Sequence, residues 1–390
     1  MKRENEEEVK GEEHGAKAVG LLELTLYFLR LGALGFGGPI ALAGYMQRDL
    51  IPRGWITDRE YQEGLAFSQM MPGPLAAQLA MWIGFIRHGV VGASLIGIVF
   101  ILPTFLLVLL ISYLYVAYRG ISVVQALFYG IGPVVIAIVA LSALRIAKKT
   151  VGRDWRLWLI FAVVALTTVV VRAEIALLFL AAGGIGVLIY HPPRYWRRGT
   201  TTPAVWGISG FLGIAGAPRL LELGAFFVKA GAFTFGSGLA IVPFLHQGVV
   251  LQHHWLNERQ FLDAVAVGII TPGPVVITAA FVGYLVDGFV GAAVAAAAVF
   301  SPVYFFVLFI GRYIIRYREN AGLQGFIKGA TSAASGAIAG ASVILGQGSV
   351  IDVPTAIMCA ASLLILWRFK VPEPLLIAVA AVAGIFLYRG

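Results

Sequence analysis

The stretch FSQMMPGPLAAQLA at residues 67–80 places Pro-Gly-Pro in the middle of an apolar segment, and VGIITPGPVVITAA at 267–280 does so again. Each proline removes a backbone donor and collides with the preceding helical turn, so a regular helix cannot run through either motif. We therefore expect one helix before each motif, a second helix after it, and a break between them.

Composition indicates the environment of these broken segments. The chain of 390 residues is 59% hydrophobic and 13% charged, with a mean hydropathy of +0.87. Soluble domains carry about 25% charged residues, so the sequence predicts an all-α polytopic membrane protein whose main partner is the lipid bilayer. Broken backbone is not tolerated against lipid, so the breaks should face a cavity or one another.

Several function classes are disfavoured by the same inventory. The single Cys359 excludes an intramolecular disulfide, and the six histidines lack metal-ligand spacing, so no metal and no other cofactor is expected. Neither a nucleophile close to a base nor a P-loop is found, which argues against a membrane enzyme and a self-contained ATP-driven pump. The net charge of +9 fits basic cytoplasmic loops rather than nucleic-acid binding.

The two Pro-Gly-Pro motifs belong to an internal repeat. YFLRLGALGFGGPIALAGY at 27–45 matches FFVKAGAFTFGSGLAIVPF at 226–244, WITDREY at 55–61 matches WLNERQF at 255–261, and Gly130 falls opposite Gly329. The sequence predicts an acidic cytoplasmic tail (1–20), a first membrane repeat (21–190), a linker (191–220) and a second membrane repeat (221–390). Six apolar segments per repeat give about 12–13 transmembrane segments.

Basic residues predict how the repeats are oriented. In the first repeat they follow the fourth apolar segment (122–146), where Arg145 and Lys149 belong to the basic loop, and the sixth segment (174–190). In the second repeat they follow the third segment (289–315) and the fifth (353–367). Because basic loops stay on the cytoplasmic side, this shift predicts inverted repeats. The change of orientation requires one further crossing, for which residues 203–217 are the candidate.

The helix before each break has a recognisable start. Thr57 with Glu60, and Asn257 with Gln260, have the spacing of a capping box. The helix after each break would begin inside the protein, with unpaired N–H groups and a partial positive charge. Such a helix N-terminus favours anion binding, and inverted repeats bring broken segments together as in secondary transporters.

The candidate substrate site consists of residues at and beside these breaks. Two are charged, Arg30 and Lys229, and they occupy matching positions in the first segments. The others are Phe36, Gly37, Gly38, Pro39, Gln69, Pro72, Gly73, Pro74 and Gln78 in the first repeat, and Gly236, Ser237, Gly238, Thr271, Pro272, Gly273, Pro274 and Thr278 in the second. Two alternatives stay open: the cations extend to the membrane surface and pair with Glu23 and Glu222, and the polar residues, with Ser68, satisfy carbonyls freed by the breaks.

Four carboxylates are candidates for coupling transport to a second ion: Glu23, Glu63, Glu222 and Asp263. Glu63 and Asp263 lie in the first turns of the helices that precede the Pro-Gly-Pro motifs. They fit better as solvated acids that complement a helix dipole.

The FGGP element at 36–39, the PGP element at 72–74 and their degenerate second copy resemble the signature of the chromate ion transporter family over residues 20–390. The resemblance implies a long-chain, two-domain member that exports chromate across the cytoplasmic (inner) membrane by using the proton motive force. Other oxyanions such as sulfate fit the same implied chemistry. The second copy departs from the pattern, because Gly238 stands where Pro39 would align, so the two halves need not contribute equally.

Other functions stay open at this point. Oxyanion uptake or exchange differs from export only in direction and coupling ion, and an anion channel would line a continuous pore with the broken helices. The sequence is also compatible with a homodimer.

Overall fold

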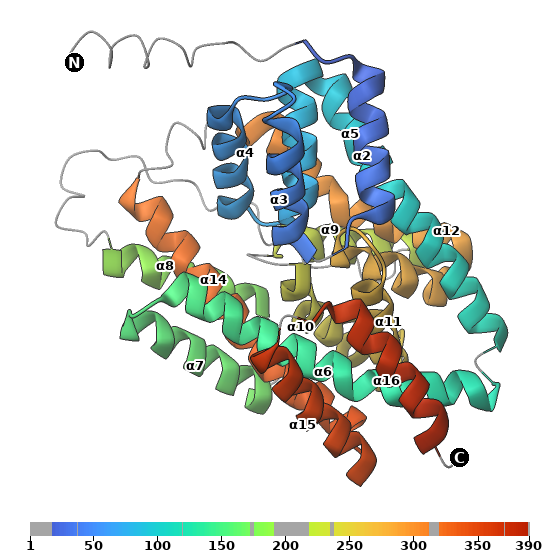
Figure 1. The fold of residues 1–390 in the computed structure, drawn as a ribbon. Helices are drawn as coiled ribbons and strands as arrows, with labels where there is room; N and C mark the ends of the chain where they lie inside the picture. Colours follow the sequence, from blue (N-terminus) through green and yellow to red (C-terminus); the bar gives the residue numbers. More distant parts are fainter. Residues whose placement is uncertain are drawn as a thin grey trace, which may run out of the picture.

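The computed structural model describes residues 18–36, 38–118, 120–171, 175–190, 218–234, 238–311, 320–369 and 371–388. Every regular element in these ranges is helical, which confirms the predicted all-α fold (Figure 1). Most of the predicted tail and linker, including the candidate crossing at 203–217, lies outside the described residues.

The first repeat starts with half-length helices and continues with long ones. Its helices are α2 (Leu21–Leu34), α3 (Gly38–Leu50), α4 (Asp58–Met70), α5 (Leu75–Tyr118), α6 (Ser122–Val151), α7 (Trp155–Val171) and α8 (Ile175–Tyr190). The second repeat follows the same order. Its helical elements are α9 (Arg219–Ala232), a short turn at Gly238–Ala240, α10 (Ile241–Leu245), a π-helical stretch at His246–Gln252, α11 (Glu258–Ile270), a 3₁₀ turn at Val275–Ile277, α12 (Thr278–Phe305), a π-helical stretch at Phe306–Ile310, α14 (Ala321–Ser349), α15 (Val353–Arg368) and α16 (Glu373–Leu387).

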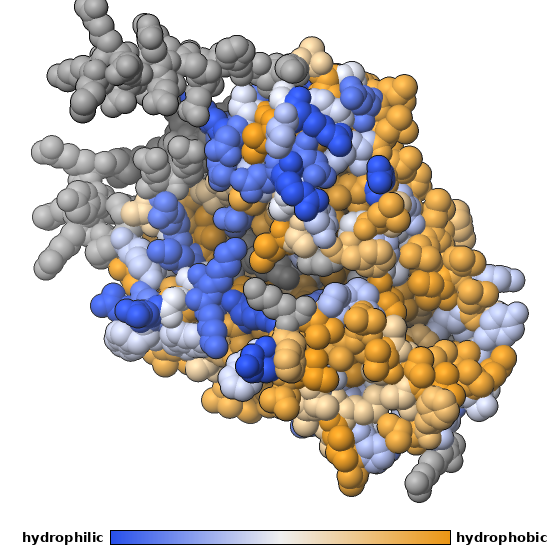
Figure 2. Space-filling model, in the orientation of Figure 1, coloured by the Kyte–Doolittle hydropathy of each residue, from blue (hydrophilic) through white to orange (hydrophobic). Residues whose placement is uncertain are grey.

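Among the described residues, four helical stretches are long and apolar enough to cross a membrane: Leu75–Tyr118, Ser122–Val151, Val275–Ile310 and Ala321–Ser349. The first and third of these each contain a break. The surface over α12, α16 and the end of α5 is hydrophobic, as expected for a face in contact with lipid (Figure 2). By contrast, α3 and α4 have 13 residues each, or about 20 Å of helix, which is shorter than a bilayer core of about 30 Å.

The Pro-Gly-Pro break reverses the chain. The helix α4 ends at Met70, just before the Pro-Gly-Pro motif, and residues 75–87 of α5 then run back along α4. A Cβ on Gly64 would lie 2.2 Å from Trp82 Cδ1, and Arg87 at the far end of this pair forms an ion pair with Glu60. The second segment is therefore a helical hairpin with Pro-Gly-Pro at its tip. The sequence predicted the break but not the reversal.

A second reversal follows each hairpin. His88 and Gly89 leave the helical conformation within α5, as Asp287 and Gly288 do within α12. The paired helices then approach closely through glycine: a Cβ on Gly84 would lie 2.5 Å from the carbonyl oxygen of Gly92. Residues 90–118 of α5 consequently form one long helix after two antiparallel half-length ones.

The two repeats are interleaved rather than placed side by side. A Cβ on Gly130 of α6 would lie 2.0 Å from the Ala380 carbonyl oxygen of α16, and a Cβ on Gly329 of α14 would lie 2.1 Å from the Ala182 carbonyl oxygen of α8. Each of these long helices thus packs against the last helix of the other repeat. Only glycine allows so close a backbone approach.

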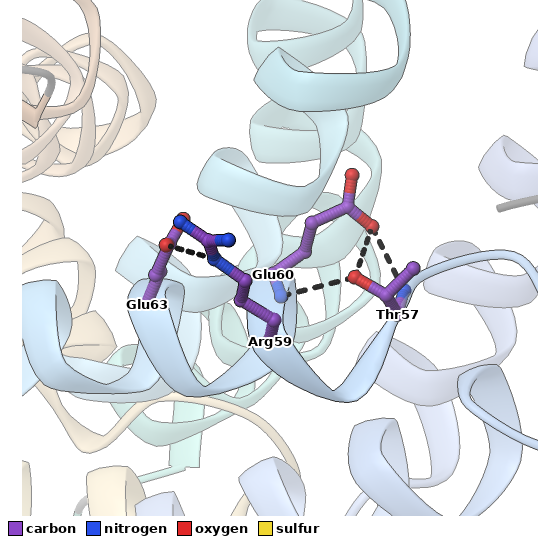
Figure 3. A network of polar contacts seen from close by, with 4 residues as sticks. All are labelled: Thr57, Arg59, Glu60 and Glu63. Carbon is purple, nitrogen blue, oxygen red and sulfur yellow. Dashed lines mark hydrogen bonds and ion pairs between the residues drawn. The ribbon is translucent and has the colours of Figure 1, made fainter. Parts of the chain in front are cut away.

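Both predicted capping boxes are confirmed. Thr57 accepts a hydrogen bond from the Glu60 backbone while the Glu60 carboxylate accepts one from the Thr57 backbone, and Asn257 with Gln260 repeats this arrangement. Figure 3 shows Glu60 directed toward Thr57, with Arg59 reaching Glu63 on the neighbouring face of α4. The half-length helices therefore start where local side-chain chemistry dictates.

Candidate functional site

The tips of the broken segments are joined by reciprocal hydrogen bonds. The Gly73 N–H donates to the carbonyl of Thr234 at 2.5 Å, and the Gly273 N–H donates to the carbonyl of Gly35 at 3.1 Å. In the repeat alignment Thr234 corresponds to Gly35, so each Pro-Gly-Pro tip contacts the first break of the other repeat. The breaks face one another, as the sequence predicted.

Side chains satisfy part of the backbone that the breaks leave exposed. Thr104 Oγ1 lies 2.8 Å from the Pro272 carbonyl oxygen, and Gln78 Nε2 donates to the Pro72 carbonyl oxygen at 2.6 Å. Gln78 is fully buried, and its Oε1 has no hydrogen-bond partner among the described residues. Val303 stands opposite Thr104 in the repeat alignment, so the two tips differ chemically.

Three polar candidates bond to their own helices. Thr271 donates to the Val267 carbonyl at 2.9 Å, Thr278 to the Val275 carbonyl at 2.8 Å, and Ser68 to the Gly64 carbonyl at 2.8 Å. These hydroxyls are therefore used within the fold, but the Gly64 and Val267 carbonyls lie inside helices and are not among those that the breaks leave without a donor.

A cavity of about 670 Å³ adjoins both breaks of the first repeat. It is bordered by the first turn of α3, the end of α4, the start of α5, and facing stretches of α6 and α14. Its lining residues are Pro39, Ile40, Ala66, Gln69, Met70, Leu75, Arg145, Ile146, Lys149, Thr150, Gln324, Ile327, Lys328 and Thr331. Figure 2 shows a hollow between the hydrophilic side chains over α3 and α4 and those beside α8 and α14.

The lining of the cavity carries three cations. Arg145 and Lys149 lie one helical turn apart on α6, and Lys328 projects from α14 with its Nζ 4.8 Å from the Tyr190 ring centroid. No carboxylate is among the described lining residues. Arg145 is partly engaged, because its guanidinium donates to the Leu366 carbonyl at 2.7 Å and lies 4.0 Å from the Glu373 carboxylate, with which it forms an ion pair.

Helix N-termini add to this potential. The helix α3 starts at Gly38 and α5 starts at Leu75, and the first turn of each borders the cavity. Unpaired N–H groups and the helix dipole favour an anion at both places. The cavity therefore combines three cations, two helix starts and the neutral polar groups of Gln69, Gln324 and the lining threonines, which is a suitable environment for an oxyanion.

The second repeat has no equivalent set of cations. With the alignment that pairs Gly130 with Gly329, Ile344 stands opposite Arg145, Gly348 opposite Lys149, and Tyr129 opposite Lys328. The basic cavity is thus a property of one side of the molecule, although the fold repeats.

The predicted site residues fall into four groups. Pro39 and Gln69 line the basic cavity, with Gly38 beginning α3 beside it. Ten are buried at the tips: Pro72, Gly73, Pro74, Gln78, Gly238, Thr271, Pro272, Gly273, Pro274 and Thr278. Arg30, Phe36 and Lys229 lie outside the cavity lining, Arg30 and Phe36 being exposed and Lys229 half-buried. Gly37, Gly236 and Ser237 lie outside the described residues.

The predicted carboxylates also separate. The Glu222 carboxylate lies 2.9 Å from the ring nitrogen Nδ1 of His253, and Glu23 is exposed. Glu63 pairs with the exposed Arg59 at 3.1 Å, in agreement with a solvated role. For Asp263 the solvated interpretation is wrong, because its side chain is only 5% exposed and accepts a hydrogen bond from Tyr115 at 2.7 Å.

The cations of the cavity were not predicted as site residues. Arg145 and Lys149 were assigned to a basic cytoplasmic loop, but both lie within α6. Their four-residue spacing places them on one helix face, and Lys328 directly precedes Gly329, the partner of Gly130 in the alignment. These two signals are visible in the sequence, but only packing shows that the residues face the breaks.

Comparison with known proteins assigns the chain to a family. The model of the family described as "Chromate transporter" matches twice, over residues 22–187 and 221–385. The chain belongs to the chromate transporter family. This membership confirms the sequence duplication and the assignment to a transporter rather than an enzyme, in a multi-pass membrane protein.

Relatives within the chromate transporter family extend over nearly the whole chain. A "Chromate transport protein" of Cupriavidus metallidurans is 49% identical over 97% of this chain and 96% of its own length. A "Probable chromate transport protein" of Synechococcus elongatus is 47% identical over 96% of this chain and 98% of its own. A "Chromate transport protein" of Pseudomonas aeruginosa is 30% identical over 93% of this chain and 91% of its own length. No solved structure matches the chain.

Proposed function

We propose that the protein is a secondary transporter that exports chromate from the cytoplasm across the inner membrane, driven by the proton motive force. The observation that carries this proposal is the basic cavity beside the two breaks of the first repeat. Family membership and the names of the relatives support chromate as the substrate.

The chemistry of the cavity suits a tetrahedral dianion. Arg145, Lys149 and Lys328 supply positive charge that can compensate two negative charges, and hydrogen bonds to charged groups are about twice as strong as neutral ones. The helix starts at Gly38 and Leu75 supply further donors. Sulfate has a similar size and charge, so we expect it to compete for the same cavity.

The direction of transport is argued from the surrounding charges. The end of α6 that carries Arg145 and Lys149 also carries Lys148, and Arg153 and Arg156 follow directly. Basic segments of this kind stay on the cytoplasmic side. The cavity then opens toward the cytoplasm, where an exporter must collect its substrate.

Alternating access between inverted repeats is part of the proposal. The reciprocal bonds of Gly73 and Gly273 support it, as does the bond of 2.6 Å between Ser94, near the start of its long helix, and Tyr304, near the end of the corresponding one. Equivalent helices that run antiparallel fit a two-fold axis in the membrane plane. Because the repeats are interleaved, they cannot move as two separate halves. We propose instead that the helical hairpins with Pro-Gly-Pro at their tips move relative to the long helices α6 and α14.

The test is chromate accumulation in inverted membrane vesicles, with and without a proton gradient and with excess sulfate as competitor. The variants Lys149→Gln and Lys328→Gln should each raise the KM for chromate about tenfold or more, the loss of one charge-assisted hydrogen bond. Arg30→Gln is the matched control: it also removes a cation near a break, but outside the cavity, so its KM should stay within about twofold of wild type.

Each alternative gives a different result in this assay. Flux that does not saturate would indicate a channel, and accumulation in right-side-out vesicles alone would indicate uptake. If Lys149→Gln and Lys328→Gln transported like wild type while Arg30→Gln failed, the basic cavity would not be the substrate site.

A further inference from the structure

A second, smaller cavity lies at the other end of α6. It has a volume of about 150 Å³ and is lined by Tyr115, Val124, Gln125, Phe128, Asn257, Arg259, Gln260 and Asp263. We propose that Asp263 is the proton-binding group of the transport cycle and that it exchanges protons with the side of the membrane opposite the basic cavity. This inference rests on the proposed function and names the residue through which the proton gradient would act.

The position of Asp263 differs from that of a surface acid. Its side chain is 5% exposed, and one carboxylate oxygen accepts a hydrogen bond of 2.7 Å from the Tyr115 hydroxyl. A buried carboxylate without full compensation is unfavourable in its charged form. Asp263 nevertheless lines a cavity that reaches polar groups at the start of α11, so a proton has a short path to it from water.

The two cavities lie toward opposite ends of a membrane-length helix. Gln125 of α6 lines the small cavity and Lys149 of the same helix lines the basic one. Lys149 comes 24 positions after Gln125, which corresponds to about 36 Å of helix at 1.5 Å per residue and exceeds the bilayer core of about 30 Å. Asp263 is therefore reached from the side opposite the cation cluster.

In the part of the chain that the structure describes, few charged or titratable groups surround Asp263. Arg259 lies one turn before it on α11 and acts on it electrostatically, and Tyr115 approaches from α5. From α6 the cavity receives the neutral Gln125, to which Tyr388 at the end of α16 donates a hydrogen bond. His246, the first residue of the π-helical stretch before α11, packs against Phe261 of α11 and is already paired with Glu258 at 2.8 Å.

The contact between Asp263 and Tyr115 joins the two repeats. Asp263 belongs to the second repeat and Tyr115 to the first, so a change of protonation acts on the packing between them. When a carboxylate oxygen takes up one proton from water, the charge of Asp263 is neutralised and its acceptor role toward Tyr115 weakens. The same proton is released, and the charge restored, when the cycle exposes the group to the other side.

The experiment compares two modes of transport in proteoliposomes. Labelled chromate is followed first as gradient-driven accumulation and then as chromate–chromate counterflow without a pH gradient. Asp263→Asn should reduce gradient-driven accumulation at least tenfold while counterflow stays within about twofold of wild type. Glu63→Gln is the matched control, because Glu63 occupies the corresponding position but is paired at the surface, and it should retain both modes.

A second variant covers the case in which Asp263→Asn fails to fold. Tyr115→Phe keeps the carboxylate and removes a hydrogen bond to its charged form, so gradient-driven transport should reach its half-maximal rate at a higher pH, by on the order of one pH unit. Gradient-driven transport in Asp263→Asn equal to wild type would overturn the assignment. A folded Asp263→Asn protein that loses counterflow as well, or an unchanged pH profile in Tyr115→Phe, would also overturn it. Wild-type protein without any counterflow would instead refute the proposed function itself.

Discussion

Replacing Gly73 by alanine tests how the tips of the broken segments are held together. Gly73 has φ +130°, and a Cβ there would lie 2.7 Å from both Gln78 Nε2 and Val303 Cγ2. A non-glycine residue in such a conformation costs about 1–3 kcal/mol. Overpacking against the two side chains adds about 1–3 kcal/mol, and weakening the bond from its N–H to Thr234 adds about 0.5–1.5 kcal/mol.

The matched control is Gly89→Ala. Gly89 also has a positive φ, +58°, but no atom of the described residues lies within 4 Å of its Cβ position. This variant carries the backbone cost alone, so Gly73→Ala should be the less stable of the two by about 2–4 kcal/mol. Equilibrium unfolding of both purified variants in mixed micelles measures the difference. Equal stabilities would show that the tip contacts seen in the structure do not hold the repeats together.

Three further perturbations probe other contacts. Thr104→Val introduces the residue that stands at the matching position of the second repeat and leaves the buried Pro272 carbonyl without its donor. The free energy of unfolding should therefore fall by about 1–3 kcal/mol. An unchanged value would mean that this hydrogen bond contributes nothing to stability. Glu60→Gln leaves the mostly buried Arg87 without its carboxylate and should lower the free energy of unfolding by about 3–5 kcal/mol. Arg87→Met removes the buried charge itself, so it should cost less. Denaturation of both purified variants measures the difference. A hydrogen bond from Tyr190 holds the pKa of Asp154 below its usual range, so the stability it provides is present at neutral pH and lost as the pH falls below about 4. Tyr190→Phe should therefore be less stable than wild type at pH 7, and the two proteins should converge in acid; a constant gap would contradict this.

Much of the local structure could be predicted from the sequence. The repeat, the capping boxes at Thr57 and Asn257, and the helix ends at Met70 and Ile270 all depend on short-range chemistry: cap hydrogen bonds, and prolines that cannot continue a helix. Hydropathy likewise predicted the membrane environment, because it reflects the composition of the chain and not its path.

The path of the chain was decided only by the tertiary structure. A Pro-Gly-Pro break is compatible with a continued crossing or with a hairpin, and the choice depends on contacts such as Gly64 against Trp82, between residues distant in sequence. The same holds for the candidate site. Lys149 and Lys328 resemble surface charges until α6 and α14 are placed beside the breaks, and Asp263 resembles a solvated first-turn acid until Tyr115 from the other repeat buries it. Sequence periodicity shows which residues share a helix face, but which face meets which depends on packing energies summed over the whole fold.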